Sequence, residues 1–232
     1  MNIFIKENFL TDEQTATLKE SVYKLQPKWK HVSQMPVNSQ EVRSRYPAEI
    51  VSHAEKVMEN LNFLGEGIYI LDGKLTAIDK EVQDLMKEEF AWLYEKVAKF
   101  FQTLYNNPNV VLHDELPIPG FHIFSGNKQE RRNFEWHHDS TVHLLVDNVD
   151  QTSVYSFVIL VESPKDTAHL EYKLDDSEDT YTLNYQSNSF HMWKGSLMHR
   201  IGAFELGADE KRITFQGHIY YDTKTESYKI YF

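Results

Sequence analysis

The residues Lys211-Arg-Ile-Thr-Phe-Gln-Gly-His-Ile-Tyr-Tyr221 alternate between polar and apolar side chains, as the residues of a half-buried β-strand do. Successive side chains of a strand point to opposite faces. One face therefore carries a polar row and the other an apolar row: Arg212, Thr214, Gln216, His218 and Tyr220 against Ile213, Phe215, Gly217 and Ile219. The polar row contains no lysine or glutamate, so it suits either a half-solvated strand or the wet interior of a barrel that holds a site.

The sequence after Asn109 is typical of β-strands throughout. Short runs of β-branched and aromatic residues alternate there with clusters of turn residues. The pattern predicts ten strands: Val110–His113, Phe121–Phe124, Phe134–His138, Ser153–Val161, Leu170–Leu174, Thr180–Tyr185, Ser189–Trp193, Met198–Ala203, Lys211–Tyr221 and Tyr228–Tyr231. Many short strands after a helical block indicate a β-sandwich or a barrel supported by helices.

The first part of the chain reads as helical. Thr11 and Gln14 form a capping-box pattern that begins a helix ending near Leu25, and a second helix is predicted over 48–61. The longest helical pattern runs over 79–105, where apolar residues recur at three- and four-residue steps. We find no linker and no internal repeat, so we predict a single domain over 1–232. Residues 1–108 would form a helical buttress and 109–232 the core.

The amino-acid composition limits which binding partners and which cellular compartment we expect. The chain has 232 residues, 24 basic and 35 acidic, with a net charge of −11. An acidic surface repels phosphate backbones, so we expect no nucleic-acid partner. The chain has no cysteine, which removes disulfides and zinc–thiolate sites and fits a reducing compartment. We expect a cytoplasmic protein with no signal peptide and no membrane-spanning segment.

A possible metal site begins at Trp136-His137-His138-Asp139. On a strand, His137 and Asp139 point the same way and His138 points the other way. A second imidazole, His199, follows sixty residues after Asp139. Two imidazoles and one carboxylate hold non-haem Fe(II) on one face and leave the other positions open for chemistry. The alternative is that these residues are ordinary surface or structural ones, because the chain has eleven histidines.

Arg212 follows His199 by thirteen positions and begins the alternating strand. A guanidinium matches a carboxylate in bidentate fashion, and the Thr214 hydroxyl on the same face adds a further hydrogen bond. The pair therefore suits the far carboxylate of a keto-acid cosubstrate. The alternative for Arg212 is a surface salt bridge in an acidic protein.

Taken together, these residues resemble the Fe(II)/2-oxoglutarate-dependent dioxygenase superfamily over about 117–221, and in part its phytanoyl-CoA dioxygenase branch. The resemblance rests on the order His-x-Asp, distal His and Arg-x-Thr, and on Trp136 and Gly195-Ser196. It implies an α+β, mainly β fold with a double-stranded β-helix (jelly roll) core and N-terminal helices packed on one sheet.

The same resemblance assigns roles to individual residues. It implies that His137, Asp139 and His199 bind Fe(II), that Arg212 and Thr214 bind 2-oxoglutarate, and that dioxygen is the other cosubstrate. Halogenases of the superfamily have a small residue in place of the carboxylate ligand. Because Asp139 is present, the resemblance implies hydroxylation or another oxidation.

Substrate recognition is less defined by the sequence. The polar loop over 125–133 carries Arg131 and Arg132, which could hold a substrate carboxylate or phosphate or could simply balance the acidic surface. Trp136 could line the substrate site or belong to the core. We predict a small-molecule substrate, a polar metabolite such as an amino acid.

Two other classes of protein remain open at this stage. One is a cupin-type metalloenzyme that does not use 2-oxoglutarate, although the Glu that cupins place soon after the first histidines is missing here. The other is a metal-free β-sandwich binding module. Measurements of metal binding and keto-acid binding would distinguish a dioxygenase, a cupin-type enzyme and a binding module from one another.

Overall fold

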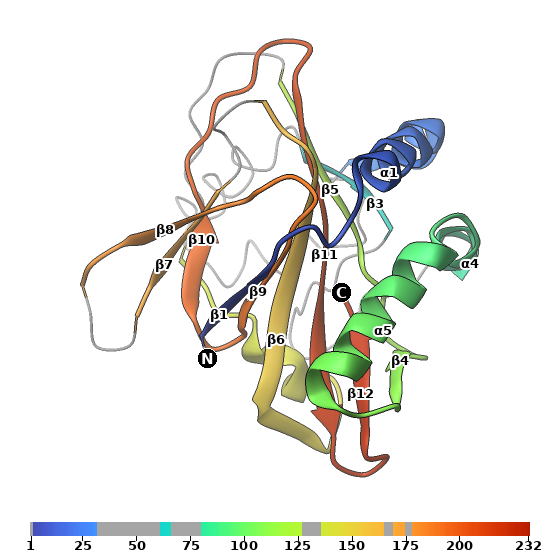
Figure 1. Ribbon diagram of the computed structural model, residues 1–232, viewed down its shortest axis with the longest axis vertical. Helices are drawn as coiled ribbons and strands as arrows, with labels where there is room; N and C mark the ends of the chain where they lie inside the picture. Colours follow the sequence, from blue (N-terminus) through green and yellow to red (C-terminus); the bar gives the residue numbers. More distant parts are fainter. Residues whose placement is uncertain (1, 32–60, 66–79, 127–135, 165–168, 175–177) are drawn as a thin grey trace, which may run out of the picture.

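The computed structural model describes residues 2–31, 61–65, 80–126, 136–164, 169–174 and 178–232. Most of their regular structure is β, with helices on one side (Figure 1). The larger sheet is mixed and has nine strands, seven of them in the order β1-β9-β6-β11-β5-β3-β2. Their bounds are β1 (Ile3–Lys6), β9 (Phe190–Lys194), β6 (Val149–Glu162), β11 (Lys211–Asp222), β5 (Gly120–Ser125), β3 (Leu61–Leu64) and β2 (Lys30–His31), and the remaining two strands are β12 (Ser227–Tyr231) and β4 (Val110–Leu112).

The alternating segment of the sequence is β11, in the middle of this sheet. Its partner on one side is β6, and on the other side β5 pairs with its first half and β12 with its second half, all antiparallel. The sheet is mixed because β4 pairs with β12 in parallel. β11 is thus paired along both edges, and none of its residues is exposed.

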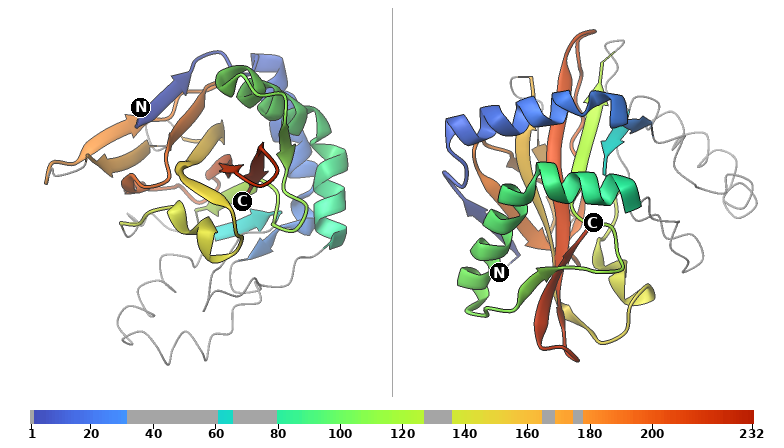
Figure 2. Two further views of the ribbon diagram at one scale, coloured as in Figure 1. Left: turned by 90° about the horizontal axis from the view of Figure 1, so that it is seen from below. Right: turned by 90° about the vertical axis from the view of Figure 1, so that its right-hand side faces the viewer.

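The two faces of β11 have different neighbours. Its apolar residues Ile213, Phe215 and Ile219 belong to the main core, which they share with helices α1 (Asp12–Lys24), α4 (Lys80–Glu89) and α5 (Ala91–Tyr105). These helices lie across one face of the large sheet (Figure 2). The predicted packing of helices on one sheet is confirmed, and the polar row of β11 therefore points away from them.

A three-stranded antiparallel sheet lies on the side opposite the helices (Figure 1). Its strands are β10 (Met198–Ile201), β7 (His169–Lys173) and β8 (Tyr181–Asn184). A second apolar cluster joins it to the large sheet: Val158, Leu160, Leu170, Leu183, Tyr185, Trp193 and Leu197. The polar row of β11 therefore points toward the side that the small sheet covers.

The predicted helices are partly confirmed and partly corrected. Thr11 and Gln14 form the expected capping box, with reciprocal hydrogen bonds of 3.1 Å at the start of α1. The single long helix predicted over 79–105 is wrong, because the chain leaves helical geometry at Phe90 (φ −111°, ψ 21°). The Phe90 ring is fully buried, 4.8 Å from the Phe121 ring, and the change of direction there lets both α4 and α5 cover the sheet (Figure 2).

Other differences are local. The helix predicted over 48–61 lies outside the described residues except at its end, where Leu61 begins β3. The strand predicted over 134–138 is described only from Trp136, and His137 makes one isolated antiparallel bridge with His199 instead of a continuous strand. β6 begins at Val149, four residues before the predicted start. In the described part of the chain, no helix is long and apolar enough to cross a membrane.

Candidate metal centre

The three predicted ligands, His137, Asp139 and His199, come together. One ligand atom from each lies within 4.8 Å of the other two. The His199 Nε2 atom is 3.1 Å from Asp139 Oδ2, and the His137 Nε2 atom is 3.7 Å from Asp139 Oδ1. Two ligand atoms at right angles around one ion, each about 2.1 Å from it, are about 3 Å apart. The donor set and its spacing therefore fit a single divalent metal ion.

Backbone hydrogen bonds bring the three ligands to one place. His137 and His199 exchange two of them, from His137 N to His199 O (2.9 Å) and from His199 N to His137 O (3.0 Å). Asp139 N donates to Gly195 O (2.8 Å), and Gly195 N donates to Val154 O (2.8 Å). A Cβ atom at position 195 would lie 2.8 Å from Val154 Cγ1, so glycine allows this close approach. The segment that carries His137 and Asp139 is thus hydrogen-bonded to β10 directly and connected to β6 through Gly195.

His199 is oriented as a metal ligand. It is 3 % exposed, and its Nδ1 atom lies 2.9 Å from the Leu197 carbonyl oxygen. A carbonyl oxygen only accepts, so Nδ1 carries a proton, and Nε2 is the ring nitrogen directed at Asp139 and the candidate metal position. His137 is exposed, which leaves one side of the ligand group open.

The charges in the group favour an ionised Asp139. Burial alone would raise the pKa of the Asp139 carboxyl, but the adjacent His199 imidazole holds that pKa well below its usual range. Burial likewise acts to lower the pKa of His199, and the Asp139 carboxylate reverses this and raises it. Metal binding requires neutral imidazoles, so it would displace any proton held between these two residues.

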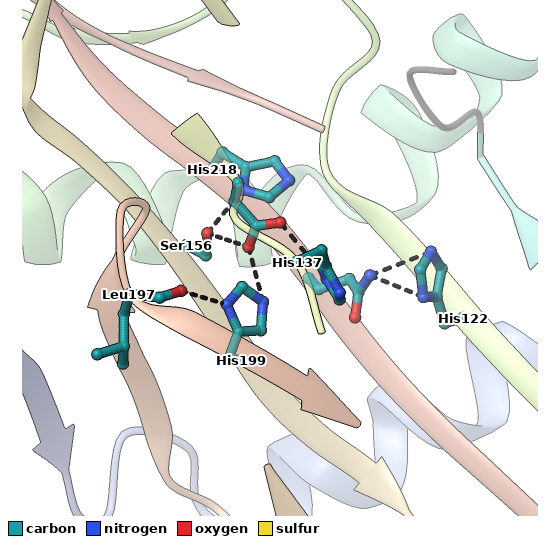
Figure 3. A network of polar contacts seen from close by, with 8 residues as sticks. His122, His137, Ser156, Leu197, His199 and His218 are labelled. Atoms are coloured by element: carbon teal, nitrogen blue, oxygen red, sulfur yellow. Dashed lines mark hydrogen bonds and ion pairs between the residues drawn. The ribbon is translucent and has the colours of Figure 1, made fainter. Parts of the chain in front are cut away.

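Ser156 and His218, both labelled in Figure 3, connect Asp139 to the large sheet. The Ser156 hydroxyl donates to Asp139 Oδ2 at 2.6 Å and lies 3.0 Å from His218 Nδ1. Ser156 comes from β6 and His218 from the polar row of β11. Nothing in the sequence singled out Ser156, whereas the polar row of 211–221 already included His218.

Arg212 is a buried cation. It is 2 % exposed, and its guanidinium carbon lies 5.3 to 5.8 Å from the ring centroids of Phe204, Phe124 and Tyr185. Its Nε atom has no hydrogen-bond partner, and no carboxylate of a described residue forms an ion pair with it. Burial lowers the pKa of Arg212 to about 10. The alternative of a surface salt bridge is therefore wrong: Arg212 is a buried cation on the same row of β11 as His218.

The other residues of the polar row of β11 are also buried or partly buried. Thr214 is 1 % exposed, whereas Gln216 and His218 remain partly accessible although β11 is central in the sheet. The Gln216 side-chain amide nitrogen lies 2.7 Å from Nδ1 of His122, on the neighbouring strand β5. Desolvation lowers the pKa of His122 to about 3, so its ring is neutral at pH 7.

Of the three residues predicted to bind substrate, the structure describes only Trp136. Arg131 and Arg132 lie outside the described residues. Trp136 is half-buried beside the ligand His137, and its ring centroid is 4.6 Å from the Arg200 guanidinium carbon and 5.2 Å from Lys173 Nζ. These cation–π contacts hold the indole next to His137, at the edge of the candidate site. A role in substrate binding stays a prediction.

Two solved structures share the fold. One is the non-haem α-ketoglutarate-dependent epimerase SnoN from nogalamycin biosynthesis, with a TM-score of 0.53 and 12 % identity over 94 % of this chain and 80 % of that one. The other is a prolyl hydroxylase in complex with a hypoxia inducible factor oxygen degradation domain peptide fragment from Trichoplax adhaerens, with a TM-score of 0.51 and 11 % identity over 97 % and 86 %. No protein-family model and no curated protein sequence matches the chain. The predicted resemblance is thus confirmed at the level of the fold.

Proposed function

We propose that this chain is a non-haem Fe(II)/2-oxoglutarate-dependent oxygenase with a double-stranded β-helix (jelly roll) core. The observation that carries the proposal is the combination of a two-histidine, one-carboxylate group with a buried guanidinium that lacks a carboxylate partner among the described residues. In this proposal His137, Asp139 and His199 hold Fe(II). The epimerase and the hydroxylase that share the fold support it.

The ligand group suits this chemistry because it leaves part of the coordination sphere free. Two histidines and one carboxylate, presented on one face, leave positions for a chelating keto-acid and for dioxygen. The chemistry that a ferrous ion supplies when bound is oxidation by dioxygen, coupled to decarboxylation of 2-oxoglutarate to succinate and carbon dioxide. The contribution of this chain is orientation: Leu197 fixes the tautomer of His199, and backbone hydrogen bonds fix the positions of all three ligands.

Arg212 and Thr214 are the residues that we assign to the distal carboxylate of 2-oxoglutarate. A guanidinium can donate two parallel hydrogen bonds to a carboxylate, and the apolar rings around Arg212 lower the local dielectric and strengthen the ion pair. Thr214 is buried on the same face of β11. An anion at this position would also neutralise a charge that has no carboxylate partner among the described residues.

For the substrate we propose a small polar metabolite such as an amino acid. Trp136 lies directly before a metal ligand and is held by two cationic side chains, which makes it a candidate wall of the substrate site. Arg131 and Arg132 precede it in the sequence and remain candidates for an anionic group of the substrate.

The test is anaerobic addition of Fe(II) and 2-oxoglutarate to the purified protein. We expect one Fe(II) per chain, a weak visible charge-transfer band that needs both components, and loss of this band in the H199A variant. Fe(II) uptake without the band would overturn 2-oxoglutarate binding and favour a cupin-type enzyme. No stoichiometric Fe(II) uptake would favour a metal-free binding module. Substrate-stimulated release of succinate then identifies the substrate.

A further inference from the structure

We infer that Ser156 and His218 are positioning residues, which hold the Asp139 carboxylate in a fixed orientation for the metal. The inference rests on the proposed metal site and goes beyond its three ligands. Neither residue would contact the metal. Each acts on it through Asp139, by a chain of hydrogen bonds that begins on the central strand of the large sheet (Figure 3).

The direction of each hydrogen bond follows from the inventory of donors. An ionised carboxylate only accepts, so the single hydroxyl proton of Ser156 goes to Asp139 Oδ2 at 2.6 Å. The Ser156 oxygen then has only lone pairs left for His218 Nδ1, 3.0 Å away. His218 must therefore carry its proton on Nδ1 and donate it to Ser156. In this series of hydrogen bonds, every donor points toward Asp139. In such an arrangement each hydrogen bond polarises and strengthens the next.

The two residues are mounted on rigid parts of the fold. Ser156 and His218 are direct cross-strand partners in the pairing of β6 with β11, and Ser156 also faces Trp193 across the pairing of β6 with β9. Ser156 is 2 % exposed. Asp139, in contrast, lies in an irregular segment between the isolated bridge at His137 and a short 3-10 helix. The serine hydroxyl thus ties the carboxylate of this segment to the centre of the sheet.

The hydrogen bond from Ser156 to Asp139 should raise the affinity of the site for its metal. Groups that orient a metal ligand typically contribute a factor of about 10 to 100 to affinity. Without the Ser156 hydroxyl, the carboxylate can rotate away from the position between the two imidazoles, and this freedom must be lost when the metal binds. We therefore expect a weaker metal site in which the same three ligands are still present.

The experiment measures the affinity of the full chain for Co²⁺ alone, by titration with visible absorption as the readout. The variant S156A removes the hydroxyl. S153A is its matched control, because Ser153 is on the same strand but its hydroxyl contacts Asp150 O and Tyr221 N. H218L removes the N–H donor, whereas H218N places an amide N–H near the former Nδ1 position. We expect about 10- to 100-fold weaker binding for S156A and H218L, and near wild-type binding for S153A and H218N.

A double variant tests whether His218 acts through Ser156. In the S156A background, H218L should cause little further loss, since the link to Asp139 is already broken, whereas independent structural effects would add. Wild-type affinity in S156A, or additive losses in the double variant, would overturn the inference while the metal site stands. No Co²⁺ binding by the wild-type chain would overturn the metal site itself. Thermal unfolding of the metal-free proteins checks folding, and if H218L does not fold, S156A against S153A and H218N decides.

Discussion

The substitution Arg212→Met tests the cosubstrate site through two opposite effects. In the metal-free protein, Arg212 is a buried cation with an unpaired Nε atom. Replacing even a buried ion pair with apolar side chains of similar volume is typically neutral or stabilising, by about 1–4 kcal/mol, so removal of this charge should not lower the stability of the metal-free protein. With 2-oxoglutarate bound, the same substitution removes a desolvated ion pair, which costs about 2–5 kcal/mol. Since about 1.4 kcal/mol is a factor of ten, affinity for 2-oxoglutarate should fall by roughly 30- to 4,000-fold.

The two effects are measured separately. Urea unfolding of the metal-free and 2-oxoglutarate-free protein should give a free energy of unfolding for R212M that equals or exceeds that of the wild type. Anaerobic titration of the Fe(II) protein with 2-oxoglutarate should show the loss of affinity. K24M is the control, because Lys24 pairs with Glu89 at 2.7 Å on the helix side of the large sheet, and losing this charge should leave 2-oxoglutarate affinity unchanged. Unchanged 2-oxoglutarate affinity in R212M would show that Arg212 does not bind the cosubstrate, and a clear loss of stability in the free protein would show that its charge is already paired.

Three further outcomes follow from the structure. H137A and D139A should each abolish stoichiometric Fe(II) uptake, measured by anaerobic dialysis and iron analysis, and full uptake by either would remove that residue from the ligand set. T11A should lower the free energy of unfolding by about 1 kcal/mol, because it removes the hydrogen bond to Gln14 N; an unchanged urea midpoint would contradict this. The pKa of His122 is lowered from 6.5 to about 3, so its neutral form contributes stability that is complete above pH 6.5 and is lost as pH falls toward 3. H122N should therefore lose about 1–2 kcal/mol less between pH 7 and pH 5 than the wild type, and identical pH profiles would show that His122 is not the group responsible.

Local patterns predicted those parts of the fold that local interactions determine. The capping box at Thr11 and the alternation of 211–221 are both confirmed, because each depends on residues a few positions apart. The polar row could not be assigned to solvent or to an internal site from β11 alone. That choice depends on the small sheet, which covers this side of the large sheet through contacts such as Leu160 with the cluster around Leu170.

The convergence of His137, Asp139 and His199 was predictable because a ligand set has a recognisable chemistry and order. Ser156 had no such signal: a single serine in an apolar strand gains its role only from the register that pairs β6 with β11, 62 residues away along the chain. The break at Phe90 was hidden for a similar reason. The helical pattern continues through it, and only the burial of its ring against β5 shows that the chain turns there.

The metal assignment is best tested by a crystal structure determined under anaerobic conditions with Fe(II), using anomalous scattering at the iron edge. We expect one anomalous peak within about 2.0–2.3 Å of one side-chain atom each from His137, Asp139 and His199. An anomalous peak elsewhere, or none in a crystal whose protein binds Fe(II) in solution, would contradict it.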